Sequence, residues 1–266
     1  MDGHLPRLLD ESGYGEPGFA ASYDRFRPRP PQALLELLPS LLETDLKLVV
    51  DLGSGTGLST RVWAASADEV IGIEPNDAMR GFAEAAPTPE NVRYLNASSY
   101  ETGMWDASAD LVTAAQSLQW MDPQRVFPEV GRILRRGGVF CAYNYVGFQT
   151  PLWEPEAAFE AAWERKNELR RERGLERSDA RTQPSRELLA ASGVFRHTRQ
   201  LALHSVEEGD GERLIGFALS EGSMRTLLAA GTTEEEVGLD RLREVAATIT
   251  GPIPWWIVYE VWVGLK

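Results

Sequence analysis

The stretch "VVDLGSGTGLST", residues 49–60, combines the features that decide the fold of this chain. Apolar residues lead into Asp51, and three glycines follow at every second position, Gly53, Gly55 and Gly57. A short buried strand that ends in a glycine turn and continues into a helix is typical of the first unit of an open α/β sheet. Glycine lets the backbone approach a bound molecule closely and adopt positive φ angles. The stretch therefore predicts a ligand site at the carboxyl end of the first strand.

Short segments rich in β-branched and aromatic residues alternate with helical patterns along the chain. Such alternation indicates βαβ units and a parallel sheet. We therefore predict an α/β fold with a doubly wound, seven-stranded, mostly parallel sheet of the Rossmann-like type. The expected strands are residues 46–53, 68–74, 91–97, 109–117, 137–147, 198–206 and 254–266. The last of them is so rich in β-branched and aromatic residues that we expect it to be buried on both faces.

Helical patterns dominate the parts of the chain outside this sheet. We expect an N-terminal helical lid at residues 1–45 and a ligand-binding core at residues 46–150. Residues 151–250 would add one core strand and a helical substrate or lid insertion, and residues 251–266 would form the final core strand. Within the insertion, Thr233 and Glu236 have the spacing of a helix capping box.

Composition and charge narrow the class of ligand. The 266 residues are 43% hydrophobic, enough for a sizeable core, and carry a net charge of −13. This negative field disfavours DNA or RNA as a partner and favours a small molecule. The single cysteine, Cys141, excludes an intrachain disulfide and a cysteine-rich zinc site, and we expect no metal. With no signal-peptide pattern and no apolar run of about 20 residues, we predict a cytoplasmic monomer or homodimer that does not contact membranes.

Three ligand classes compete for the glycine turn. A phosphate-binding P-loop needs a lysine directly after the last glycine, where this chain has Leu58. A dinucleotide fingerprint needs glycine or alanine at the same position. Asp51 would repel a pyrophosphate, whereas it suits a ligand that carries an ammonium group. S-adenosylmethionine has an α-ammonium, a sulfonium and no phosphate, so we predict it as the cofactor.

The second expected strand agrees with this interpretation. It ends in Glu74, about 20 residues after the turn, where a carboxylate can accept hydrogen bonds from both hydroxyls of a ribose. Pro75 and Met79 then offer apolar faces to an adenine ring. An acid before a glycine turn and a second acid at the end of the next strand together indicate a nucleoside ligand.

Several motifs together resemble class I S-adenosylmethionine-dependent methyltransferases. The chain is most similar to the small-molecule branch that includes ubiquinone and menaquinone C-methyltransferases and trans-aconitate methyltransferase. The matching motifs are "FAASYDRFRP", "VVDLGSGTG", "GIEPNDAM", "NASSYETGM", "ADLVTAAQSLQWM" and "EVGRILRRGGVF", which span residues 19–140. The resemblance implies methyl transfer to an oxygen, carbon or nitrogen nucleophile of a small molecule.

The resemblance also implies a cofactor site assembled from the ends of several strands. The residues implied to bind the cofactor are Tyr23, Asp51, Gly53, Ser54, Gly55, Thr56, Gly57, Glu74, Pro75, Met79, Ala97, Ser98, Ser99, Gln116 and Leu118. Many relatives have an acid near Ser99, for which Glu101 is the candidate substitute here. Relatives often have a histidine where this chain has Gln119, and glutamine cannot act as a general base at neutral pH.

The candidates for a catalytic residue are Tyr143, Tyr145 and His204. Strand alternation places the two tyrosines on one face of the fifth strand, and His204 lies at the far end of the sixth. Methyl transfer is an in-line displacement that depends mainly on positioning and on exclusion of water, so a base is not obligatory. Three other functions stay open: a protein that binds S-adenosylmethionine without catalysis, a NAD-dependent oxidoreductase built on the same type of sheet, and a nucleic-acid methyltransferase, which the net charge of −13 disfavours.

Overall fold

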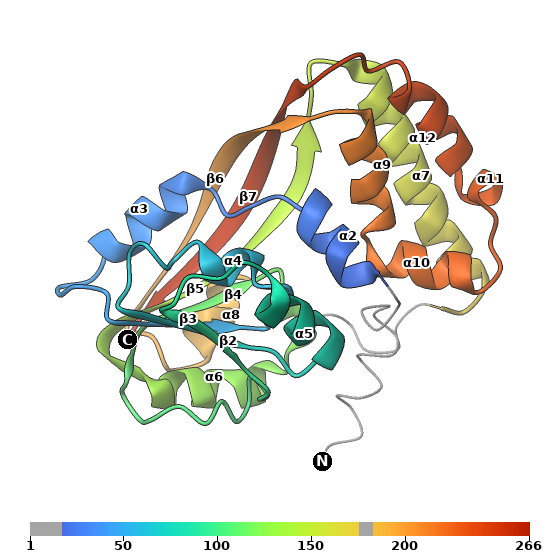
Figure 1. The fold of residues 1–266 in the computed structure, drawn as a ribbon. Helices are drawn as coiled ribbons and strands as arrows, with labels where there is room; N and C mark the ends of the chain where they lie inside the picture. Colours follow the sequence, from blue (N-terminus) through green and yellow to red (C-terminus); the bar gives the residue numbers. More distant parts are fainter. Residues whose placement is uncertain (1–17, 176–182) are drawn as a thin grey trace. The chain divides into compact units, whose positions relative to one another are not determined.

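The computed structural model describes residues 18–175 and 183–266 (Figure 1). Seven strands in these residues form one sheet in the order β3-β2-β1-β4-β5-β7-β6. The strands are β1 (Leu48–Leu52), β2 (Glu69–Ile73), β3 (Val92–Leu95), β4 (Ala109–Ala115), β5 (Leu134–Gln149), β6 (His197–Gly209) and β7 (Ile253–Leu265). The predicted α/β class and the mostly parallel, seven-stranded Rossmann-like sheet are confirmed.

Parallel pairing around β1 creates the ligand-binding position of the sheet. β1 pairs in parallel with both β2 and β4, so Val50 lies between Ile71 and Val112, and all three side chains are fully buried. β3 and β5 continue the parallel arrangement on the two sides. The strand order reverses between β1 and β4, and open α/β sheets bind ligands beyond the carboxyl ends of the strands at such a point.

The described residues form two compact units. The sheet unit contains residues 29–147, 183–205 and 258–266, and the helical unit contains residues 18–28, 148–175 and 206–257. The N-terminal boundary differs from the expected one: α3 (Gln32–Ser40) belongs to the sheet unit and α2 (Phe19–Phe26) to the helical unit. Residues 1–17 of the expected lid lie outside the described residues.

The sheet unit has five helices among the described residues, some of which begin at a side-chain cap. These helices are α3, α4 (Leu58–Arg61), α5 (Asp77–Ala85), α6 (Pro123–Ile133) and α8 (Arg186–Ala191), with a 3-10 turn, η1 (Leu118–Trp120). The side chain of Asn76 accepts a hydrogen bond from the Met79 N–H, and that of Asp122 accepts one from the Gln124 N–H. Such caps satisfy backbone donors that the first helical turn leaves unpaired.

The hydrophobic core of the sheet unit lies between α6 and the central strands. Buried residues of α6, including Val126, Val130 and Ile133, form one cluster with residues of β1, β2, β4 and β5. Cys141 on β5 is also fully buried and pairs in register with Thr113 on β4. This packing fixes the carboxyl end of β4, which carries part of the candidate site.

The helical unit contains more breaks than the sequence pattern indicates. Its helices are α2, α7 (Trp153–Glu172), α9 (Gly211–Leu219), α10 (Gly222–Ala229), α11 (Glu234–Val237) and α12 (Leu239–Ala246). The sequence pattern is helical over residues 211–231 and 232–251. In the structure the first stretch is divided after Leu219 and the second at Gly238, where φ is 79°. The predicted capping box of Thr233 and Glu236 is confirmed at the start of α11.

The last strand is only partly buried on both faces, so that expectation is half wrong. Burial alternates along the first part of β7, where Trp255 is fully buried and Trp256 is 39% exposed. Only residues 261–264 are buried without interruption. Within residues 18–175 and 183–266, no helix combines the length and the apolar character that crossing a bilayer requires.

Candidate cofactor site

The glycine loop at the carboxyl end of β1 adopts a conformation that only glycine takes up easily. The φ angles of Gly53, Gly55 and Gly57 are 67°, 58° and 83°. A Cβ atom on Gly53 would lie 2.7 Å from the Cβ of Ser117, and one on Gly57 would overlap the hydroxyl of Tyr94. At Gly53 and Gly57 a side chain would both strain the backbone and clash with a neighbouring residue. At Gly55 a methyl group would strain the backbone but would have room.

Asp51 has a structural role that the sequence interpretation missed. Its side chain is fully buried and accepts hydrogen bonds from Ser59 Oγ at 2.6 Å, Thr60 Oγ1 at 2.7 Å and Thr113 Oγ1 at 2.7 Å. Burial raises the pKa of Asp51, and these three hydrogen bonds partly oppose the rise. The carboxylate thereby joins β1 to α4 and β4. It has no exposed surface, and its predicted contact with a ligand ammonium stays a prediction.

The hydroxyl partners of Asp51 leave a partial signal in the sequence. Ser59 and Thr60 follow the last glycine closely, so a carboxylate at the strand end could be expected to cap that turn. Thr113 comes from a strand 62 positions further along the chain, and only the pairing of β1 with β4 brings it to Asp51.

Glu74, at the end of β2, connects the glycine loop to the neighbouring strand. Its Oε2 accepts a hydrogen bond from the Gly55 N–H at 2.8 Å, and its Oε1 accepts one from the Asn76 N–H at 2.8 Å. The residue is 7% exposed, and burial raises the pKa of its carboxyl, with these two hydrogen bonds opposing the rise. A carboxylate offers about four lone-pair positions, so two are left for the hydroxyls of a ribose.

The residues predicted to surround the adenine come from the carboxyl ends of β2 and β3. Met79 is 3% exposed, and its Cε would lie 3.5 Å from a Cβ on Gly55. Pro75, Ala97 and Ser99 are partly exposed. Ser98 accepts hydrogen bonds through its Oγ from the N–H groups of Tyr100 and Glu101, both at 3.2 Å. Ser98 therefore stabilises its own loop.

Glu101, the candidate for the missing acid, is exposed and forms an isolated β-bridge with Ser98. Its role, and those of Pro75, Met79, Ala97 and Ser99, stay predictions.

The turn after β4 forms the other side of the glycine loop. Gln116 has a φ of 53°, its N–H donates to the Tyr143 carbonyl at 3.0 Å, and its carbonyl accepts from Gln119 Nε2 at 2.8 Å. Leu118 is fully buried and belongs to the hydrophobic core, and its contact with a cofactor stays a prediction. Tyr23 lies on α2 in the helical unit, and its contact with a cofactor stays a prediction.

Several buried polar atoms beside this loop have no hydrogen-bond partner among the described residues. They are Ser54 Oγ and Thr56 Oγ1 in the loop, and Gln116 Nε2 and Gln119 Oε1 in the turn after β4. Buried polar groups in folded proteins are nearly always paired, so unpaired ones indicate a position that a ligand or water fills. The cradle of glycines, Glu74 and these polar atoms fit the polar nucleoside and amino-acid parts of S-adenosylmethionine.

The three catalytic candidates differ in burial. Tyr143 and Tyr145 both contact the ring of Tyr259 on β7, with centroid distances of 6.5 and 6.3 Å, so they share one face of β5 as expected. Tyr143 is 2% exposed, and Tyr259 donates its hydroxyl to the Arg29 carbonyl at 2.6 Å. His204 is exposed on β6, an edge strand of the sheet. A catalytic role for any of the three stays a prediction.

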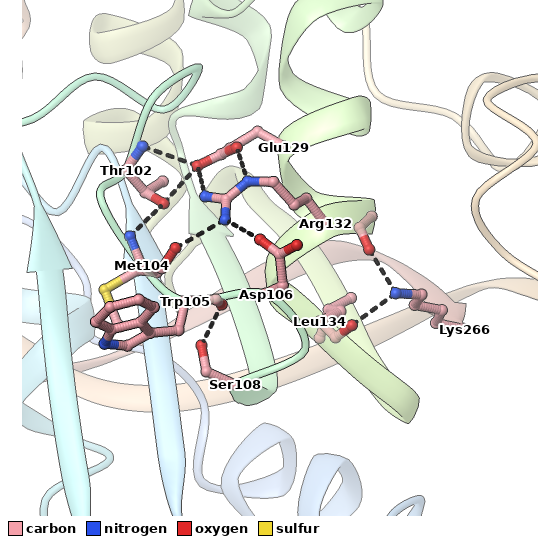
Figure 2. Close-up of polar contacts among 10 residues, drawn as sticks. Thr102, Met104, Trp105, Asp106, Ser108, Glu129, Arg132, Leu134 and Lys266 are labelled. Atoms are coloured by element: carbon pink, nitrogen blue, oxygen red, sulfur yellow. Dashed lines mark hydrogen bonds and ion pairs between the residues drawn. The ribbon is translucent and has the colours of Figure 1, made fainter.

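A second polar cluster lies before the amino end of β4, opposite the glycine loop (Figure 2). Glu129 accepts hydrogen bonds from the N–H of Thr102 at 2.8 Å and from Arg132 Nε and Nη2 at 2.8 and 2.7 Å. Arg132 also donates to the Met104 carbonyl at 2.8 Å and to Asp106 at 2.6 Å. Burial acts to raise the pKa of Glu129, but the hydrogen bonds from Arg132 and Thr102 outweigh it and hold that pKa below its ordinary value.

Comparison with known proteins gives similarities to methyltransferases. The methyltransferase domain family of type 11 matches residues 50–142. The chain is 32% identical over 132 residues to the "Probable S-adenosylmethionine-dependent methyltransferase CRG1" of Saccharomyces cerevisiae, covering 48% of this chain and 45% of that protein. It is 31% identical over 126 residues to the trans-aconitate 2-methyltransferase of Variovorax paradoxus, covering 46% and 47%. The chain thus spans about half the length of the curated relatives it matches.

A solved structure extends the similarity of fold to most of the chain. It is described as "a Putative Type II Methyltransferase from Anaeromyxobacter dehalogenans", with a TM-score of 0.68 and 22% identity, and the alignment covers 90% of this chain and 98% of that one. The family match confirms the predicted cofactor, S-adenosyl-L-methionine. Residues 50–142, with the glycine loop, Glu74 and the turn after β4, therefore match the methyltransferase domain model.

Proposed function

We propose that this protein transfers the methyl group of S-adenosylmethionine to an oxygen, carbon or nitrogen atom of a small-molecule acceptor. The observation that carries this proposal is the pairing of the glycine loop with Glu74. All three glycines have positive φ, and the Gly55 N–H bonds the Glu74 carboxylate at 2.8 Å. A carboxylate held at that position suits a ribose, which S-adenosylmethionine and NAD share. Leu58 disfavours a dinucleotide, because it stands where the dinucleotide fingerprint needs glycine or alanine.

The residues of the site are suited to positioning more than to proton transfer. When bound, S-adenosylmethionine supplies an electrophilic methyl group on its sulfonium. The backbone of the glycine loop lets a ligand approach β1 closely, and Glu74 orients it through the free lone pairs of its carboxylate. Asp51 keeps the loop and α4 in place through its three hydroxyl partners. Rate acceleration would come from alignment of the reacting atoms and from exclusion of water.

Charge and similarity support a small-molecule acceptor. The net charge of −13 opposes the approach of a polyanion such as DNA or RNA. One relative is named for its action on trans-aconitate, a small carboxylic acid. Carboxylic acids are therefore the first acceptors to test, followed by phenols and amines.

Transfer of a labelled methyl group tests the proposal directly. The full chain is incubated with S-adenosylmethionine carrying a labelled methyl group and with panels of carboxylic acids, phenols and amines, and low-mass products are separated. We expect label in at least one panel, loss of that label in Glu74→Ala, and retention in Glu69→Ala. Glu69 is the matched control because it begins the same strand at the end remote from the loop.

Calorimetry with S-adenosylhomocysteine and with NADH separates the proposed methyltransferase from two alternatives, a non-catalytic binding protein and an oxidoreductase. Binding without methylation of any acceptor would favour a protein that binds the cofactor without catalysis. Binding of NADH in place of S-adenosylhomocysteine would contradict the proposal and favour an oxidoreductase.

A further inference from the structure

The structure raises the question of which groups receive the charged amino-acid end of the cofactor. Asp51 is the obvious partner for an ammonium group, but it is fully buried and already accepts three hydrogen bonds from hydroxyl groups. The turn after β4 instead carries two buried atoms of opposite polarity. Gln116 Nε2 is a donor and Gln119 Oε1 is an acceptor, and neither has a hydrogen-bond partner among the described residues.

The orientation of the Gln119 carboxamide is fixed by its own hydrogen bond. Gln119 Nε2 donates to the Gln116 carbonyl at 2.8 Å. Rotating the amide by half a turn would place Oε1 against that carbonyl, and two acceptors cannot share a hydrogen bond. The nitrogen must therefore face Gln116, which leaves Oε1 as an acceptor available to a ligand.

Gln116 is held in a backbone conformation that few residues adopt. Its φ of 53° lies in the left-handed region, which is costly for a residue with a side chain. Two hydrogen bonds fix it there, from its N–H to the Tyr143 carbonyl and from Gln119 to its own carbonyl. Such strain is kept where the side chain must point in one particular direction, and here that direction ends in an unpaired donor.

The turn that carries both glutamines lies against the glycine loop. A Cβ on Gly53 would lie 2.7 Å from the Cβ of Ser117 and 3.4 Å from the Cε of Met121. Ser117 also donates its hydroxyl to the Leu52 carbonyl at 2.6 Å. Gln116 and Gln119 belong to the same turn as Ser117 and Met121, so the turn that carries both carboxamides packs beside Gly53.

We propose that Gln116 and Gln119 together bind the zwitterionic end of S-adenosylmethionine, with Gln116 Nε2 donating to the α-carboxylate and Gln119 Oε1 accepting from the α-ammonium. This inference rests on the proposed function. An uncharged donor and an uncharged acceptor match a zwitterion, which has no net charge. They also cost less to bury than an ionised carboxylate. Asp51 then serves to hold the loop together, and the recognition of the amino-acid end passes to the two carboxamides.

Ligand analogues that lack one charged group at a time test this assignment. Calorimetry with the full chain compares S-adenosylhomocysteine with its deaminated and its decarboxylated analogue. One hydrogen bond to a charged group is worth about tenfold or more in affinity. We therefore expect the unaltered protein to bind each analogue about tenfold more weakly than S-adenosylhomocysteine.

Substitution of one glutamine should remove the preference of the protein for one charged group of the ligand. The preference for the other charged group should remain. In Gln119→Met the affinities for S-adenosylhomocysteine and its deaminated analogue should become equal within about threefold. In Gln116→Met the affinities for S-adenosylhomocysteine and its decarboxylated analogue should become equal within about threefold. Gln119→Glu keeps an acceptor and loses the donor to the Gln116 carbonyl, so it should keep the preference for the ammonium group. Gln124→Met, an exposed glutamine on α6, is the matched control and should change neither ratio.

The pattern of affinity losses shows whether Gln119 contacts the ligand or only stabilises the turn after β4. If Gln119→Met weakens all three ligands by the same factor, or if Gln119→Glu loses the ammonium preference as fully as Gln119→Met does, Gln119 acts only by supporting the turn and the assignment is overturned. A protein that binds none of the three ligands would instead contradict the proposed function. Far-ultraviolet circular dichroism of each variant confirms that it is folded.

Discussion

The two ends of β4 carry polar clusters with opposite properties. Before its amino end, Glu129, Arg132 and Thr102 pair with one another, and the pKa of the buried carboxylate is lowered (Figure 2). Beyond its carboxyl end, the glycine loop and its surroundings hold unpaired polar atoms, a residue with strained φ, and two carboxylates, Asp51 and Glu74, whose pKa values burial raises.

The difference shows how a ligand site can be distinguished from a structural cluster in one domain. A structural cluster lowers the free energy of the folded chain by itself, so its donors and acceptors are matched. A ligand site has unmatched groups and strained angles, whose cost the rest of the fold must offset until a ligand binds. Arg132 and Glu74 are both central residues, but we expect changes at Arg132 to alter stability and changes at Glu74 to alter binding.

The largest expected effect comes from filling the space beside Gly57. In Gly57→Ala, a positive φ of 83° and a clash with the Tyr94 hydroxyl act together, and we expect the free energy of unfolding to fall by about 3 kcal/mol. Gly55→Ala is the matched control, because its φ of 58° causes strain but its nearest neighbour would lie at 3.5 Å. Its loss should be about 1 kcal/mol. Urea denaturation measures both, and equal losses would show that space does not distinguish the two glycines.

The second-largest effect is expected when the polar cluster of Glu129, Arg132 and Thr102 loses its cation. In Arg132→Met the buried carboxylate of Glu129 loses its cation, and we expect a loss of about 2 kcal/mol in the free energy of unfolding, with no change in the affinity for S-adenosylhomocysteine. Arg93→Met removes an exposed ion pair with Glu69 and should cost less than about 0.5 kcal/mol. A drop in cofactor affinity on loss of Arg132 would contradict the separation of the two clusters.

The third effect acts on the ligand site. In Glu74→Gln one acceptor oxygen is replaced by an amide, and we expect S-adenosylhomocysteine to bind about tenfold more weakly by calorimetry. The free energy of unfolding should change by less than about 1 kcal/mol, because burial already disfavours the charged form of this carboxyl. Glu69→Gln, at the other end of β2, should leave the affinity unchanged. A large loss of stability with unchanged affinity would assign Glu74 to structure instead of binding.

The smallest expected effect concerns how the free energy of unfolding depends on pH. The contributions of Asp51 and Glu129 should change with pH in opposite directions. Burial raises the pKa of Asp51, so the stability that it contributes is complete below its ordinary pKa of about 3.9 and is lost as the pH rises through the folded value. The pKa of Glu129 is lowered, so its contribution is complete above its ordinary pKa of about 4.3 and is lost as the pH falls through the folded value. As the pH rises from acid to neutral, the free energy of unfolding of the unaltered protein should fall relative to that of Asp51→Asn. Over the same range it should rise relative to that of Glu129→Gln. Slopes of the same sign would contradict the contrast.

Features of the fold that depend on neighbouring residues could be predicted from the sequence. The seven strands, the glycine turn and the Thr233–Glu236 capping box all follow from short-range patterns of side-chain volume, flexibility and hydrogen-bonding capacity. Our sequence prediction lacks the breaks after Leu219 and at Gly238, although a glycine such as Gly238 commonly ends a helix.

Features of the site that depend on distant residues could not be predicted. The hydrogen bond that Thr113 donates to Asp51 joins two strands that are 62 positions apart in the sequence, so no local pattern indicates it. The burial of Leu118 depends in the same way on distant residues, those of α6 and the central strands. The unpaired state of Gln116 and Gln119 depends on which groups surround them in three dimensions, and spacing in the sequence carries no record of this.

The lone thiol of the chain provides a natural reporter of opening in this domain. Cys141 is fully buried, burial raises its pKa, and it pairs with Thr113, whose hydroxyl bonds Asp51. A thiol reagent can reach it only when the packing around β5 opens, so the rate of labelling measures how often this part of the sheet beside the cofactor cradle becomes exposed. Slower labelling in the presence of S-adenosylhomocysteine would report, without any engineered probe, how far ligand binding holds those strands together.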